Sequence, residues 1–447
     1  MSIKEFSIIF LGKLVALVSH LLNIGAGGTW PGEIALRIDQ DILKKFAKQV
    51  RNGIILIAGT NGKTTTAKMV KTILRDGGII IHNDSGANLL NGLTSAFINK
   101  ASWFGKIDAS WVVFEVDEAT LPLVLAEFTP KIVVLLNLFR DQLDRYGEID
   151  LIAEKWEKAL KKLPRSLTVI LNADDPQIAH LGKDLSAKVL YFGLNDPKIF
   201  LTDLQHATDS IYCLDCGGRL KYVGIYFSHL GVWSCEKCGL KRPMVNLSEW
   251  NYPLPGVYNR YNTLAAVLTA KSLGIEDKMI KMAVNNFVPA FGRQEEFTKE
   301  GKRIKLLLSK NPTGFNESLR TLKEFPGKKK TVLLALNDRI PDGRDVSWIW
   351  DVDTEELVKN VVRAIIITGD RAYDMGLRIK YSSSSEFQIS NFPGLPARAG
   401  KFQIEKELKK AIFLGLEQTP KMETLYVLST YSAMLEVRKI LAGRKIL

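Results

Sequence analysis

The sequence has 447 residues, enough for two or three domains that each bury a core of their own. Its 46% hydrophobic and 24% charged residues are typical of a globular protein and exclude a disordered or fibrous chain. The formal net charge of +13 favours polyanionic partners, namely nucleic acid, an anionic membrane surface or a phosphorylated substrate, although such a charge also serves solubility alone.

Residues 1–45 are predicted to form a helical segment. Residues 6–24 are largely apolar, but Lys13, His20 and Asn23 interrupt them, and no signal-peptide cleavage pattern follows. The stretch is therefore expected to form a helix that packs on the protein or lies against the inner face of a membrane.

Residues 46–297 are predicted to form an α/β domain with a mostly parallel sheet, because short apolar strands alternate with helical stretches. The clearest strand, at residues 53–58 (GIILIA), is followed by a glycine-rich turn and a helix over residues 64–76. The other expected elements are strands at residues 110–115, 131–137 and 167–172 and a helix at residues 259–273.

All four cysteines lie within an irregular stretch of about residues 205–245, which is predicted to be an insertion in this domain. They form two C-x-x-C pairs separated by 18 residues, which is the spacing of a four-cysteine zinc ribbon; redox pairs or an iron–sulfur site are the alternatives. Cysteines confined to one window indicate a reducing, cytoplasmic setting. The expected zinc ligands are Cys213, Cys216, Cys235 and Cys238.

Residues 298–447 are predicted to form a second, smaller α/β domain that is Rossmann-like. Charged residues cluster after an F-G-R turn at residues 291–293, which marks the boundary. Strands are expected at residues 331–337, 364–369 and 424–429, with helices between them.

Residues 59–66 (GTNGKTTT), between the first strand and its helix, are expected to bind the phosphates of a nucleoside triphosphate. Glycines permit close backbone approach, and N–H groups at a helix N-terminus bind phosphate oxygens. Lys63 would supply charge to the β- and γ-phosphates, and the Thr64 hydroxyl suits Mg²⁺. Ile57 stands where a strict Walker A loop has glycine. The nucleotide-binding residues expected from the loop are Gly59, Thr60, Asn61, Gly62, Lys63, Thr64 and Thr65.

This loop resembles that of the Mur ligases and folylpolyglutamate synthases, which use ATP to convert a carboxylate into an acyl phosphate that an amine attacks. The stretches at residues 137–147 and 256–262 are also similar to motifs of these families. The resemblance implies that Glu115 helps to hold Mg²⁺ and acts with Lys63 in catalysis, that Asn259 and Asn262 lie by adenine, and that Arg293 lies near the domain junction.

The departures from the Mur ligases narrow the resemblance. The loop begins at residue 59, which leaves no room before it for the domain that grips UDP in those enzymes. Gln142 stands at the position of a metal-binding histidine, and Trp156 rather than Lys155 matches the position of a carbamylated lysine. A substrate that needs no UDP recognition, such as a lipid-linked precursor, is expected.

A Mur-like ATPase without a UDP domain and with a four-cysteine insertion resembles the MurT family, the ligase subunits of lipid II isoglutaminyl synthase. The stretches at residues 310–314 and 337–351 extend the likeness. The resemblance implies ATP, Mg²⁺ and structural Zn²⁺, lipid II as substrate, and ammonia from a glutaminase partner of the GatD type, in a heterodimer. It also implies that an aspartate of this chain completes the partner's Cys–His pair; Asp345 is the expected residue and Asp351 the reserve.

Two other functions stay open at this point. One is a Mur or folylpolyglutamate synthase-type ligase that adds an amino acid and needs no glutaminase. The other is a nucleic-acid-binding NTPase, in which the basic charge and the cysteine module would grip the polymer. The Mur-like asparagine and glutamate stretches argue against the latter, so nucleic acid is not an expected partner.

Overall fold

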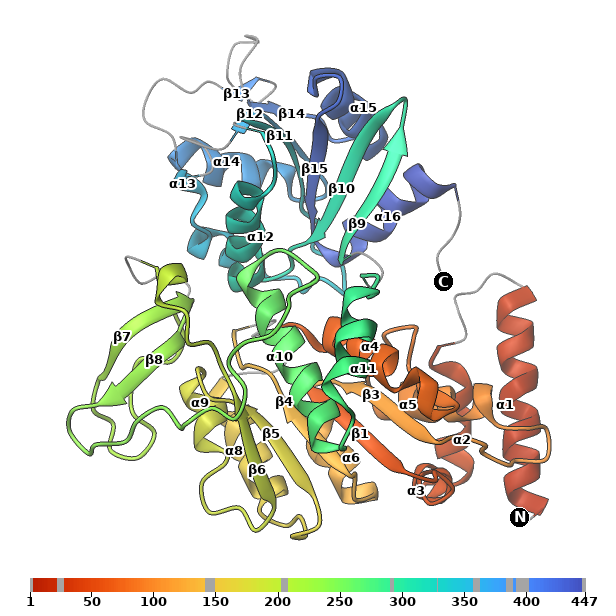
Figure 1. Cartoon of the computed structure of the whole chain (residues 1–447). Coiled ribbons are helices and arrows are strands. Elements are labelled where there is room, and N and C mark those ends of the chain that lie inside the picture. The colour runs from red at the N-terminus through yellow and green to blue at the C-terminus, as the bar shows by residue number, and fades with distance from the viewer. Residues whose placement is uncertain are drawn as a thin grey trace.

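The computed structural model describes residues 3–21, 28–140, 149–201, 208–289, 293–327, 329–356, 362–382, 389–390 and 402–443. Two α/β units lie one above the other, with a β-hairpin at the side of the lower unit and the N-terminal helix at its opposite edge (Figure 1). The expected α/β fold with a parallel sheet and a C-terminal domain is confirmed.

The lower unit contains a six-stranded sheet in the order β2-β3-β1-β4-β5-β6, in which every pairing is parallel. The first strand lies near the middle of the sheet, with β3 on one side and β4 on the other. The chain changes direction across the sheet there, and ligands of open α/β sheets bind at such a switch point, beyond the carboxyl ends of the strands. The strands are β1 (Gly53–Ala58), β2 (Ile80–His82), β3 (Trp111–Val116), β4 (Ile132–Leu135), β5 (Thr168–Asn172) and β6 (Lys188–Phe192).

Helices cover both faces of this sheet, which explains why its strands are apolar without alternation. Leu56 of β1 packs into the core on one face and Ile57 into the core on the other. The first face carries α1 (Ile3–Leu21), α2 (Trp30–Ile38), α3 (Ile42–Ala47), α5 (Leu90–Lys100), α6 (Leu121–Glu127), α8 (Ile149–Leu160) and α9 (Pro176–His180). The second face carries α4 (Lys63–Leu74), α10 (Val257–Ser272) and α11 (Asp277–Asn285).

Helix α1 is only partly packed. Ile8 and Ile9 are fully buried in the core beneath it, and Gly12 lets it approach Ile98 of α5 closely. Several large apolar side chains on the same helix remain exposed. Among the helices that the structure describes, none is long and apolar enough to cross a membrane.

The upper unit is built on a seven-stranded sheet in the order β13-β14-β12-β11-β15-β10-β9, parallel except for β9. Because β9 already pairs with β10 from Arg293, the second sheet begins before the expected domain boundary at residue 298. Its strands are β9 (Arg293–Lys299), β10 (Lys302–Leu308), β11 (Lys330–Ala335), β12 (Val362–Thr368), β13 (Ile389–Ser390), β14 (Phe402–Ile404) and β15 (Thr424–Ser429). Its helices are α12 (Pro312–Glu324), α13 (Thr354–Glu356), α14 (Ala372–Ser382), α15 (Leu408–Gln418) and α16 (Tyr431–Ala442).

Candidate active site

The phosphate loop joins β1 to α4 at the carboxyl edge of the lower sheet, as expected. Gly59 and Gly62 have φ values of 140° and 92°, a region that favours glycine. A Cβ at Gly62 would lie 2.1 Å from Asn262 Oδ1, so a side chain there is excluded. The segment after β4 is hydrogen-bonded to the loop. The Asn61 N–H donates to Asn137 Oδ1 (2.8 Å), and the Asn137 side-chain amide donates to the Asn61 carbonyl (3.0 Å).

Lys63 opens α4 and is held by an acidic residue that the sequence analysis did not single out. Its Nζ lies 2.9 Å from Glu118 Oε2 and also donates to the Gly59 carbonyl. Both side chains of the pair are nearly buried, with 11% and 6% exposed. Trp156 is fully buried and donates its indole N–H to the Glu118 carbonyl (2.7 Å). The tryptophan at the position of the carbamylated lysine therefore packs as a support for Glu118.

Glu115 lies at the end of β3 and faces the same cavity as Lys63 and Thr64. Its side chain is buried, and within the described ranges Oε2 has no hydrogen-bond partner. An unpaired buried carboxylate is costly unless a cation or donor meets it. A carboxylate and a hydroxyl are oxygen ligands of the kind that Mg²⁺ takes together with substrate phosphates, so the residues present fit this ion. Gln142 lies outside the described residues.

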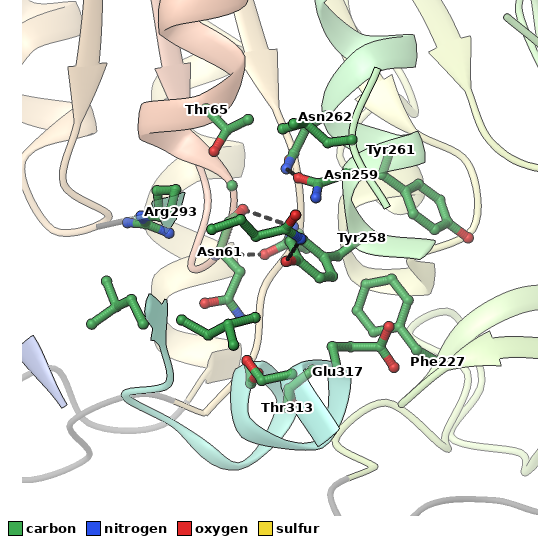
Figure 2. A pocket seen from close by; sticks show the side chains of 18 residues that line it. Asn61, Thr65, Phe227, Tyr258, Asn259, Tyr261, Asn262, Arg293, Thr313 and Glu317 are labelled. Carbon is green, nitrogen blue, oxygen red and sulfur yellow. Dashed lines mark hydrogen bonds between the residues drawn. The ribbon is translucent and has the colours of Figure 1, made fainter. Parts of the chain in front are cut away.

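A second cavity adjoins the first, and the two share Gly62, Arg293 and Leu308 in their linings. Asn259 and Asn262 of α10 line it, with Asn262 Nδ2 donating to Asn259 Oδ1 (3.2 Å). Figure 2 shows these asparagines above Tyr258, with Phe227 nearby. The cavity has the aromatic walls and amide groups that a nucleobase needs.

The upper unit closes this cavity through α12. Asn311 caps the helix by accepting from the Gly314 N–H (2.7 Å), and its amide donates to Asn61 Oδ1 of the phosphate loop (3.1 Å). At the other end of α12, Glu324 Oε2 accepts from the Gly256 N–H (2.9 Å). The two units therefore meet directly at the site.

Arg293 lies where the two cavities meet, at the first residue of the upper sheet. Burial lowers the pKa of its guanidinium, and the nearby Glu115 carboxylate partly offsets that effect. Arg293 would therefore suit a phosphate group of a nucleotide whose base lay in the second cavity and whose metal ion lay in the first.

Glu317 of α12 also lines the second cavity, which is called the base cavity below, and the sequence analysis did not single this residue out. Only 2% of the residue is exposed, and neither carboxylate oxygen has a hydrogen-bond partner among the residues that the structure describes. Burial raises its pKa to about 7; Arg320 lowers the pKa in part and Glu324 raises it further.

This pKa gives a prediction on stability. The ordinary value of 4.5 is raised to about 7 by folding, so the folded state binds the proton more tightly. The stabilisation is complete below about pH 4.5 and is lost as pH rises through about 7, which amounts to about 3 kcal/mol. Glu317→Gln is neutral at all pH, so it should raise Tm above that of the nucleotide-free wild type at pH 8. The gap should become much smaller at pH 5; an equal gap at both pH values would contradict the assignment.

The four cysteines converge beside a hairpin of β7 (Leu220–Phe227) and β8 (Leu230–Cys235). Their four Sγ atoms lie within 4.8 Å of one another, so the cluster could hold a metal ion. The turns after the two pairs are alike, because Gly217 donates to the Cys213 carbonyl (2.8 Å) and Gly239 to the Cys235 carbonyl (3.0 Å).

The two candidate aspartates differ in their surroundings. Asp345 is exposed, and its carboxylate accepts from the N–H and hydroxyl of Ser347 (2.8 and 2.9 Å). Asp351 is half-buried and lies 3.5 Å from Arg140 of the lower unit. Neither lines the two cavities described above.

Comparison with known proteins agrees with this geometry. The Mur ligase middle domain model matches residues 57–270, and the MurT ligase C-terminal model matches residues 308–434. The lipid II isoglutaminyl synthase (glutamine-hydrolyzing) subunit MurT of Staphylococcus aureus (strain COL) is 38% identical over 84% of this chain and 88% of the relative. The protein of the same name from Streptococcus pneumoniae (strain ATCC BAA-255 / R6) is 33% identical over 98% of this chain and 97% of the relative.

Solved structures show the fold. A pseudomurein peptide ligase type C from Methanothermus fervidus covers 90% of this chain and is itself covered to 80%, with a TM-score of 0.64 and 22% identity. MurF ligase from Thermotoga maritima in complex with ADP gives a TM-score of 0.59 and 16% identity, with 90% and 82% covered.

The fold and the phosphate-loop site together define an ATP-dependent carbon–nitrogen ligase of the Mur ligase type. Within that class, identity over nearly the whole chain and the match of the C-terminal unit are specific: the chain belongs to the MurT family.

Proposed function

We propose that this chain converts the α-carboxyl of D-isoglutamate in the lipid II stem peptide into the amide of D-isoglutamine, using ATP and ammonia in peptidoglycan synthesis. The observation that carries the proposal is an ATP-ligase site in a chain that matches MurT subunits over almost its full length. The substrate is inferred from the names of the relatives, and the acyl-phosphate chemistry is supported by the ATP-ligase site.

In the first step, a carboxylate oxygen attacks the γ-phosphorus of ATP, the bond to the β–γ bridging oxygen breaks, and ADP leaves. In the second, the nitrogen lone pair of ammonia attacks the acyl carbon; phosphate leaves with the C–O bond electrons and nitrogen loses a proton. Lys63, released from Glu118, would stabilise charge on the transferred phosphoryl group. Asn259 and Asn262 would hold adenine, and Arg293 would contact the phosphates.

Thr64 and Glu115 would hold Mg²⁺, directly or through water, and this ion would neutralise charge on the phosphates. The unpartnered Oε2 of Glu115 supports that assignment.

Hydroxylamine tests the acyl phosphate, since it can replace ammonia as the nucleophile. The purified chain with lipid II, ATP, Mg²⁺ and hydroxylamine should form a hydroxamate at the D-isoglutamate carboxyl, with one ADP per hydroxamate. An amino acid that drives ADP release and forms a peptide product would instead establish the amino-acid-adding ligase. Salt-sensitive stimulation of ATP hydrolysis by DNA or RNA would establish the nucleic-acid-dependent NTPase.

The ammonia is proposed to come from a glutaminase subunit in a heterodimer. Glutamine hydrolysis needs an activated nucleophile such as cysteine. The sequence contains four cysteines, and all four lie together in the cluster beside the hairpin. No cysteine outside this cluster is present to act as the nucleophile, which supports a second chain as the source of ammonia.

Asp345 is proposed to reach the catalytic Cys–His pair of that glutaminase. Its carboxylate is exposed, and its hydrogen bonds to described residues lie within its own turn, whereas Asp351 faces Arg140 of the same chain. An exposed carboxylate on a defined turn suits contact with a partner.

The cysteine cluster is proposed to bind one structural Zn²⁺, because four thiolates close a tetrahedral site and leave no position for a substrate. Elemental analysis should find one zinc per chain, and Cys213→Ser should lose the zinc and lower Tm. Loss of zinc should leave β7 and β8 more open to protease, while Lys237→Ala, which lies between Cys235 and Cys238, should retain the metal. An iron–sulfur absorption spectrum, or a metal-free cluster, would contradict the proposal.

The exposed face of α1 is proposed to lie against the inner face of the membrane that carries lipid II. Phe6, Phe10 and Leu14 follow one another at helical spacing and are exposed, and Phe10 contacts Trp103 (6.0 Å between centroids). Phe104 beside it is 77% exposed. Helix α5 packs against α1 and begins directly after Leu89, which lines the cavity that contains Lys63 and Glu115. The apolar face of α1 is therefore linked to the active site through one helix.

Vesicle binding tests this contact. The chain should sediment with phosphatidylglycerol-containing vesicles, and Phe10→Ser with Leu14→Ser should reduce the bound fraction roughly tenfold or more, since each buried side chain contributes about 1.5–3 kcal/mol. Leu123→Ser is the matched control, because Leu123 is also exposed but lies on α6. Equal loss of binding in the control would contradict the proposed face.

A further inference from the structure

The base cavity contains one group that the chemistry of ligation does not use. Glu317 projects from α12 of the upper unit and is among the residues that line the cavity with Tyr258 and the two asparagines of the lower unit, and Figure 2 shows its carboxylate beside Phe227. Only 2% of the residue is exposed, and no donor in the described part of the chain reaches either oxygen.

The surroundings of Glu317 do not satisfy it. The nearest cation is Arg320, whose Nη1 lies 3.8 Å from Oε1, too far for a hydrogen bond. The same guanidinium is already committed, because it donates to the carbonyls of Tyr226 and Ile199. A buried acceptor without a donor costs free energy, and a ligand that brings a donor recovers it.

Helix α12 fixes the place of this carboxylate. Asn311 ties the start of the helix to Asn61 of the phosphate loop, and Glu324 ties its end to Gly256. Thr313, Gly314 and Ser318 line the cavity from the same face of the helix. The side chain of Glu317 is therefore held over the base cavity and not over the phosphate end, where Lys63 and Glu115 lie.

A nucleotide offers two kinds of donor to such an acceptor, an amino group of the base and the hydroxyls of the ribose. Phe227, Tyr258 and Tyr261 line the same cavity, and aromatic rings suit the faces of a base more than a sugar. The base edge is therefore the favoured partner.

We propose that Glu317 reads the amino edge of adenine, with a carboxylate oxygen accepting a hydrogen bond from the exocyclic amine. This inference rests on the proposed use of ATP and goes beyond it, since it makes a residue of the upper unit responsible for base selectivity. Recognition of the base is then coupled to the approach of the two units, because the base lies in the lower unit and its reader in the upper.

Nucleotide binding separates this inference from the ligase reaction. Calorimetry on the full chain would compare ADP with purine riboside diphosphate, which lacks only the exocyclic amine, and with 2′-deoxy-ADP. Wild type should bind ADP about tenfold more tightly than the analogue, as expected for a hydrogen bond to a charged group. Glu317→Ala should bring the two Kd values within about twofold, and Glu317→Gln, which keeps an acceptor oxygen, should retain part of the preference.

Lys63→Ala is the matched control, because it should weaken both nucleotides equally and leave their ratio unchanged. A preference for ADP that persists in Glu317→Ala would overturn the assignment. Two other results would also overturn it. One is that Glu317→Ala loses only the discrimination against 2′-deoxy-ADP, which would place Glu317 at the ribose. The other is that wild type binds GDP more tightly than ADP and Glu317→Ala abolishes that preference. If wild type binds no nucleotide, the proposed ATP-dependent function fails first, and the two failures are distinguishable.

Discussion

Lys63→Ala should reduce the rate of ADP formation in the ligase reaction by roughly 10²–10³-fold, the effect of removing one donor that stabilises charge in a transition state. Lys63 is the cation at the N-terminus of α4, and its Nζ lies 2.9 Å from Glu118 in the nucleotide-free site. Its removal also leaves Glu118 buried beside Trp156 without a counter-charge, so a lower Tm is expected as well.

The measurement is ADP release with lipid II and ammonium under saturating ATP. Lys71→Ala is the control, because Lys71 lies on the same helix but pairs with the exposed Asp84. Nucleotide-bound Tm shifts separate lost chemistry from lost folding. A rate within tenfold of the wild type would show that Lys63 does not act on the phosphates.

Asp345→Ala should divide the reaction by nitrogen source. With the glutaminase partner bound, glutamine-driven amidation should fall about 10²–10⁴-fold, as when the acid of a Cys–His or Ser–His triad is removed. Ammonium-driven amidation should stay at the wild-type level, because Asp345 lines neither cavity of the ligase site.

Asp351→Ala is the informative comparison. Asp351 lies 3.5 Å from Arg140, so its loss should disturb the contact between the units and affect both nitrogen sources to a similar extent. If Asp351→Ala instead abolishes only the glutamine reaction while Asp345→Ala does not, the two assignments are exchanged. Equal loss with both nitrogen sources in Asp345→Ala would exclude a role confined to the partner's site.

The parts of the fold that local pattern determines were predictable. β1 and β15 have the bounds expected from their apolar runs, and α4 begins at Lys63, one residue before the expected start. A buried parallel strand is apolar throughout, and a glycine-rich turn that leads into a helix N-terminus is typical of phosphate binding. The start of the second sheet was harder to predict, because β9 is a half-exposed edge strand of mostly polar residues.

The site residues that the sequence analysis missed are those whose role depends on contacts between segments far apart in the sequence. Glu118 follows Glu115 by three positions, yet only the fold shows that it faces Lys63. Glu317 lies in an ordinary amphipathic helix far along the chain, and nothing in its local pattern marks a buried carboxylate. Asn137 lay within a stretch chosen for its resemblance to a family motif. Its two hydrogen bonds with Asn61, however, form because two strands end side by side at one edge of the sheet.

Amidation of lipid II by the purified chain, with and without a co-expressed glutaminase, would decide whether this is the ligase subunit. The stem peptide would be analysed by mass spectrometry after reaction with ATP, Mg²⁺ and either glutamine or ammonium. The account predicts that ammonium gives the amide with this chain alone, seen as replacement of a carboxyl OH by NH₂, and that glutamine does so only with the partner. No amide from either nitrogen source, with ATP turnover driven by an amino acid, would contradict it.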